Sequence, residues 1–168
     1  MPQHVADDKQ QAHRRLVDRL EQQADDIRRI VSGLGEDKLA LRTIPDKWSL
    51  KELVCHIWRV QQVFGGRLEA MLAADNPAIT SYEPEGDAEF EKLTARPAAE
   101  SLAGFLADRA RLGALLAGLS PQQWHRSGRH PEFSRYDIHF QVEYMAHHEA
   151  HHIYQMFQRR MPLGKMPH

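Results

Sequence analysis

The sequence predicts an all-α protein built from four long helices. Apolar residues recur at helical spacing in four segments, at about 6–33, 49–73, 98–118 and 136–160. No segment shows the apolar–polar alternation of a half-buried β-strand over more than a few residues. A chain of 168 residues is long enough to bury a sizeable core, and we expect residues 1–168 to form one domain.

Each predicted helix has a recognisable boundary. The first is closed by a glycine-rich turn that begins at Gly33, a residue type common just after helix ends. The second begins with a capping box, in which the hydroxyl of Ser49 accepts from the third helical amide and Glu52 reaches back to the serine amide. The third helix, rich in Ala and Leu, ends near Gly118, and Pro162 stops the fourth.

The long connection between the second and third helices bears on the topology. It carries turn signals at Pro77 and Gly86, and a short helix is expected near 88–93. Fully extended, residues 74–98 span roughly 80 Å at ~3.3 Å per residue, whereas a helix of ~24 residues is ~36 Å long. The connection can therefore run back along the whole bundle, so the second and third helices need not be antiparallel neighbours.

Composition and charge exclude several classes of function. The net charge of -1 offers no basic surface for nucleic acid or an anionic membrane. No apolar run is long enough to cross a bilayer, and the first residues lack the apolar segment of a signal peptide, so we expect a cytoplasmic protein without a membrane partner. The single cysteine, Cys55, excludes an internal disulfide and fits a reducing compartment.

Histidines concentrate in the fourth predicted helix. Four of the eleven fall in one short stretch and form two pairs with i,i+4 spacing. On a helix this spacing places two imidazoles on one face, one turn apart, as a shared metal ion requires. His148 and His152 lie near the apolar stripe that includes Met145, so we expect them to face the interior. His147 and His151 project to the other side.

His56, on the second helix, is the best candidate for a third ligand. It shares a helix face with Leu53 and Val60, and a histidine on an apolar face is costly to bury unless its ring has a partner. The alternative is a core histidine bonded to a carbonyl or a water. Three imidazoles from two helices would hold a divalent ion, zinc or nickel by ligand type, and leave coordination positions open.

The order and spacing of these motifs resemble the DinB-like (YfiT-like) superfamily. The resemblance rests on the run from Trp48 to His56 and on His148, His152 and Gln155 near the C-terminus. It implies an up-down-down-up four-helix bundle with a metal on the three histidines. It further implies either a transferase that uses a low-molecular-weight thiol, such as mycothiol or bacillithiol, or isomerase or hydrolase chemistry.

Glu149 allows several interpretations. With the histidines on either side it matches the HExxH of zinc proteases, in which the glutamate is the general base, but no acidic third ligand follows it. With His152 it forms one Glu-x-x-His motif, of which a di-iron bundle needs two. Glu149 is thus the candidate catalytic base, with a solvated surface glutamate as the alternative. Arg59 is a candidate for holding an anionic substrate group, with an ordinary surface arginine as the alternative. Gln155 is a candidate for lining a cavity, with a polar residue at the edge of the bundle as the alternative.

Together these observations favour a metal-dependent enzyme that acts on a small molecule. The expected mechanism is Lewis-acid activation, and the first expectation, given the thiol-dependent relatives that the resemblance implies, is a small-thiol-dependent S-transferase. The thiol would come from outside, because Cys55 points away from the face of His56. Two alternatives stay open: a hydrolase that needs no thiol, and a non-catalytic protein in which the ion only ties two helices together. The absence of a convincing fourth protein ligand favours the enzyme. A homodimer also stays open.

Overall fold

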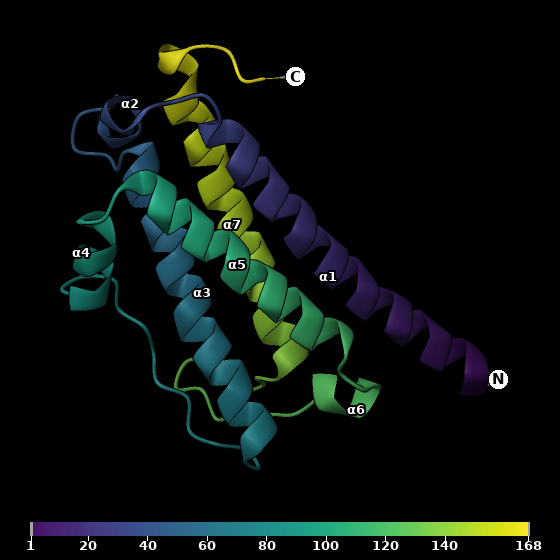
Figure 1. The fold of residues 1–168 in the computed structure, drawn as a ribbon. Coiled ribbons are helices and arrows are strands. Elements are labelled where there is room, and N and C mark those ends of the chain that lie inside the picture. The colour runs from purple at the N-terminus through teal and green to yellow at the C-terminus, as the bar shows by residue number, and fades with distance from the viewer. Residues whose placement is uncertain (1, 168) are drawn as a thin grey trace.

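The chain forms a helical bundle, shown in Figure 1, in a computed structural model that describes residues 2–167, without the side chains of residues 2–4 and 6. Four helices are long, as predicted. The elements are α1 (Pro2–Val31), α2 (Glu36–Ala40), α3 (Leu50–Ala73), α4 (Ala88–Thr94), α5 (Ala98–Ala117), α6 (Pro121–Trp124), α7 (Ile138–Arg160) and the 3-10 helix η1 (Met161–Leu163). The five-residue α2 and the three-residue η1 were not predicted, because one helical turn leaves no periodic pattern to detect.

The topology is up-down-down-up, which confirms the expectation. In Figure 1, α1 and α7 run upward, whereas α3 and α5 run downward. Each long helix packs against two others: α1 against α7 and α5, and α3 against α5 and α7. Consequently α3 and α5 are parallel neighbours, and the connection between them returns along the length of the bundle and carries α4.

The capping box at the start of α3 is present. The Ser49 hydroxyl accepts from the amide of Glu52 at 3.1 Å, and the amide of Ser49 donates to the Glu52 carboxylate at 2.7 Å. The same carboxylate pairs with Arg42 from the preceding loop. These contacts fix where α3 begins, nearly two turns before His56, and so fix which face of the helix the histidine occupies.

The loop that precedes α7 is hydrogen-bonded to the connection that follows α3. The amide of Ile79 donates to the carbonyl of Arg129 at 2.8 Å, and the amide of Arg129 donates to the carbonyl of Pro77 at 2.8 Å. Gly128 lies so close to this segment that a Cβ there would sit 2.7 Å from Cγ1 of Ile79. Two irregular segments that are distant in sequence are thereby held together at one end of the bundle.

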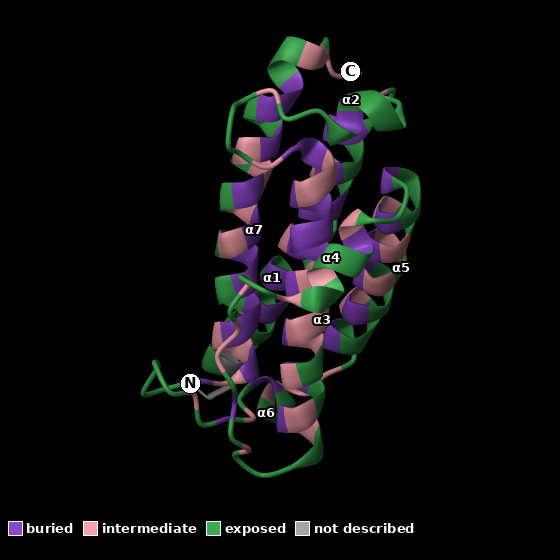
Figure 2. Ribbon diagram, turned by 90° about the vertical axis from the view of Figure 1, so that its left-hand side faces the viewer, coloured by how far each residue is buried: buried purple, intermediate pink, exposed green. Residues whose placement is uncertain are grey.

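Two apolar clusters fill the bundle. One gathers around Leu20 of α1 and Val142 of α7, and the other around Ile27 of α1 and Leu53 of α3. Figure 2 shows that the buried positions of the long helices face inward. Within residues 2–167, no helix is both long and apolar enough to span a membrane.

A buried polar layer separates the two clusters. The guanidinium of Arg109, on α5, binds both carboxylate oxygens of Glu149 on α7. It also donates to the side-chain oxygen of Gln61 at 2.6 Å and to the carbonyl of Leu20 at 2.7 Å. All four long helices meet in this layer, so it constrains how they align along the bundle axis.

Candidate functional site

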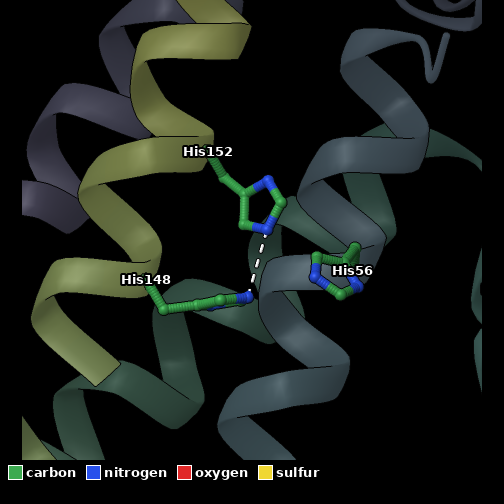
Figure 3. A group of neighbouring side chains, drawn as sticks. All are labelled: His56, His148 and His152. Carbon is green, nitrogen blue, oxygen red and sulfur yellow. Dashed lines mark hydrogen bonds between the residues drawn. The ribbon is translucent and has the colours of Figure 1, made fainter. Parts of the chain in front are cut away.

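Three histidines from two helices converge on one point, as Figure 3 shows. His56 comes from α3, and His148 and His152 come from adjacent turns of α7. One ring nitrogen of each lies within 4.8 Å of the others, and the Nε2 atoms of His148 and His152 are 3.1 Å apart. The interior-facing pair was therefore chosen correctly, since His147 and His151 are exposed.

All three imidazoles are held in their neutral form at neutral pH. Burial lowers the pKa of His56 to about 3 and that of His148 to about 4, and each neighbouring histidine opposes a further positive charge. Burial also lowers the pKa of His152, against the opposing effect of its bond to Gln155. A neutral ring keeps a lone pair on one nitrogen, which is the form that binds metal.

Gln155 determines which nitrogen of His152 faces the centre of the site. Its side-chain oxygen lies 2.8 Å from Nδ1 of His152, and its side-chain nitrogen lies 3.3 Å from Nε2 of His151. The amide oxygen is an acceptor, so Nδ1 of His152 carries the proton and donates it. The Nε2 atom of His152, directed at His148, is then an unprotonated acceptor. A ligating histidine is typically oriented by such a bond.

The donor set fits a divalent metal ion. Nδ1 of His56 is buried without a hydrogen-bond partner, so the alternative of a core histidine bonded at Nδ1 to a carbonyl is not what the structure shows. The Trp48 ring packs 4.7 Å from the His56 ring and shields it. Among residues 2–167, the group of side chains arranged to hold a metal consists of the three histidines, with no carboxylate or thiol among them.

A cavity of about 220 Å³ opens beside the histidines. His56 and His148 form part of its wall. The rest comes from α3, from the connection after it, from the loop before α7 and from α7 itself. These lining residues are Val60, Phe64, Arg67, Tyr82, Pro84, His130, Glu132, Phe133, Tyr136 and Tyr144. The two irregular segments that are hydrogen-bonded to each other thus both contribute to the wall of this cavity.

Two sequence-based interpretations need correction. Glu149 is not a solvated surface residue: it is 2% exposed, and both of its carboxylate oxygens accept from Arg109. It lies one residue beyond His148, and a helix rotates each successive side chain by ~100°, which turns Glu149 toward α5 rather than α3. Arg59 does not offer a free cation either, because Asp87 pairs with it at 2.6 Å. Cys55 is buried in the apolar core, away from the histidines, as expected.

Sequence reasoning missed most of the cavity wall. Arg67 and the aromatic residues of the loop before α7 received no role. A signal was present: Phe133, Tyr136, Phe140 and Tyr144 recur every three or four residues and form a continuous set of ring contacts. In a sequence, such a stripe more often marks a core than a binding site. Here the cavity beside it indicates that three of these rings line a binding site.

Comparison with known proteins agrees with this geometry. A family model described as the DinB superfamily matches residues 19–156. Among solved structures, YfiT from Bacillus subtilis is similar, with a TM-score of 0.79 and 21% sequence identity over 90% of this chain and 87% of that chain. That protein is described as a probable metal-dependent hydrolase with an unusual four-helix bundle topology. No curated protein matches significantly.

Proposed function

The chain belongs to the DinB superfamily, and from this membership and the histidine geometry we propose that it is a divalent-metal-dependent enzyme of the hydrolase type. One observation carries the proposal: three neutral imidazoles converge without a fourth protein ligand in residues 2–167, and two of them, His56 and His148, line a cavity. A structural metal site has a closed set of four protein ligands, whereas a catalytic site keeps a position open for substrate or water.

In this proposal His56, His148 and His152 hold the metal. When bound, a divalent ion acts as a Lewis acid that polarises an electrophilic substrate and lowers the pKa of a coordinating water or thiol. Gln155 orients the ring of His152, and Trp48 keeps water away from His56. The cavity of about 220 Å³ favours a small-molecule substrate over a macromolecule.

Hydrolysis is the first choice among the reactions because the structurally similar YfiT is described as a probable hydrolase. A thiol-dependent transfer is the second, and it needs a thiol from outside. The chain's own Cys55 is fully buried, and burial raises the pKa of its thiol, so it cannot serve as the nucleophile.

Metal content gives the first test. We expect one zinc or nickel ion per chain in the native protein, and a strong loss of bound metal in His152→Ala. The matched control is His151→Ala, which removes an exposed histidine from the adjacent position of the same helix and should retain the metal. Equal loss from both variants, or a native protein that stays metal-free with zinc or nickel supplied, would refute the assignment.

Turnover gives the second test. Ester and amide substrates would be assayed with and without mycothiol, bacillithiol or glutathione, in native protein and in His56→Ala. Hydrolysis that needs His56 but no thiol supports the proposal, and turnover that needs both would identify the transferase. A bound metal that raises the melting temperature without any turnover would identify a structural site.

A further inference from the structure

We propose that Arg67 is the specificity-determining residue of this cavity, and that it binds the carboxylate of a small ligand with an apolar, flat body. The reacting end of that ligand would lie at the three histidines, so its chemistry rests on the proposed function, whereas binding of the carboxylate does not. The substrate class is therefore a small organic acid with a free carboxylate and with its reactive group at the opposite end of the molecule.

Arg67 lies at the end of the cavity away from the histidines. It follows His56 by eleven residues on α3, which is ~16 Å along the helix axis. The Arg67 side chain is half-buried, and its guanidinium lies over the Phe64 ring, 5.0 Å from the ring centre. This direction agrees with the tilt of helical side chains toward the helix N-terminus. The cation therefore faces the cavity from its far end.

The bonds that hold Arg67 leave its charge uncompensated. Its guanidinium donates to the carbonyl of Thr80 at 2.6 Å and to the hydroxyl of Tyr136 at 3.3 Å, both neutral acceptors. A guanidinium has five N–H groups, so donors remain for a ligand. Arg59, eight residues earlier on α3, shows the opposite arrangement, since Asp87 neutralises it at 2.6 Å. No carboxylate of residues 2–167 pairs with Arg67 within 4.0 Å.

The other ionisable groups of the wall favour a ligand with a single negative charge. Burial and the nearby charge of Arg67 lower the pKa of His130, which is therefore neutral at pH 7. Glu132 brings a carboxylate to the same cavity. One cation opposed by one acidic side chain suits a monoanionic carboxylate better than a phosphate dianion, and the planar guanidinium matches a carboxylate in geometry.

The wall between Arg67 and the histidines defines the body of the ligand. Phe64, Phe133 and Tyr144 all present aromatic rings to the cavity, and Tyr144 contacts both of the others, with ring centres 5.9 Å from Phe64 and 6.0 Å from Phe133, so the rings form one continuous apolar wall. Phe64 follows His56 by eight residues, or ~12 Å along α3. A ligand that contacts both ends is thus on the order of 10 Å long, the size of a benzoate with a substituent opposite its carboxylate.

Binding of matched acids and amides to the metal-free protein tests this inference. The probe is 4-acetamidobenzoate, and its neutral counterpart is 4-acetamidobenzamide, with benzoate and benzamide as a shorter pair. The affinities are measured by calorimetry on protein freed of metal with a chelator, so that coordination of the carboxylate to a metal ion does not contribute. We expect each acid to bind about 10- to 100-fold more tightly than its amide, the range for a hydrogen bond to a charged group.

Variants then locate the preference. Arg67→Gln should abolish the preference for the acid, and Arg67→Lys should restore part of it. Arg135→Gln is the matched control, because Arg135 is exposed on the loop before α7 and does not line the cavity. Glu132→Gln should strengthen binding of the acid by removing a like charge. Melting temperatures check that each variant is folded.

The outcomes separate this inference from the proposed function. Equal binding of acid and amide by the native protein, or a preference that survives Arg67→Gln, would overturn the role of Arg67 even if the enzyme is active. Tighter binding of phenyl phosphate than of benzoate would overturn the choice of a carboxylate. If the preference for the acid depends on Arg67 but the protein shows no turnover, the role of Arg67 is supported and the proposed function is refuted.

Discussion

The buried ion pair between Arg109 and Glu149 allows a quantitative prediction. Their side chains are 4% and 3% exposed, and Arg109→Met would leave the Glu149 carboxylate in the core without a cation. Breaking a buried pair in this way costs about 3–5 kcal/mol. Against a total stability on the order of 5–15 kcal/mol, this is a large fraction. At ~2–4 °C per kcal/mol for a domain of this size, the melting temperature should fall by roughly 6–20 °C.

Urea denaturation followed by circular dichroism measures this loss directly. Arg111→Met is the control, because Arg111 belongs to the same helix and its pair with Asp108 is exposed, so little change is expected. The double variant Arg109→Met/Glu149→Leu removes both charges and should recover most of the loss. A single variant no less stable than Arg111→Met would refute the reasoning.

The same pair decides the catalytic role of Glu149. A structural glutamate predicts that Glu149→Gln lowers stability but keeps metal content and turnover per folded molecule close to the native values. A general base predicts the reverse, with turnover lost by about 10²- to 10⁴-fold in a protein of native stability. Measuring both quantities on one preparation separates the two interpretations.

Three further predictions concern other parts of the bundle. Gln155→Leu should weaken metal binding by about 10- to 100-fold, measured by competition with a chelator, because the imidazole it orients loses its partner; unchanged affinity would contradict the assigned tautomer. Gly104→Ala should destabilise the protein by about 1–3 kcal/mol, since its Cβ would lie 2.3 Å from the Trp58 ring, whereas Gly113→Ala on the same helix, with open space around it, should stabilise it. Burial lowers the pKa of His13 from 6.5 in the unfolded chain to about 4 in the folded protein. As the pH falls below 6.5, the unfolded chain therefore binds more protons than the folded protein, and the free energy of unfolding declines. Between pH 7 and pH 5, the melting temperature of His13→Phe should fall less than that of the native protein.

Local features were predictable from the sequence because they depend on residues close together in the chain. The capping box links Ser49 to Glu52 across three positions, and the shared face of His148 and His152 follows from one helical turn. The parallel course of α3 and α5 was also within reach, because the length of the connection permits it. His56 was identified as a ligand candidate because burying a lone imidazole on an apolar face has a known cost.

The partners of the charged side chains around the site were decided only by tertiary structure. Arg109 and Glu149 are 40 residues apart and Arg59 and Asp87 are 28 apart, so no periodic pattern indicates either pair. Which of several arginines is neutralised depends on the angles and alignment at which helices and loops pack. Those are set by the whole core rather than by any local sequence. The sequence therefore determined the metal-ligand candidates, whereas the packing of α3 against the connection and the loop before α7 determined that Arg67 is the cation facing the cavity.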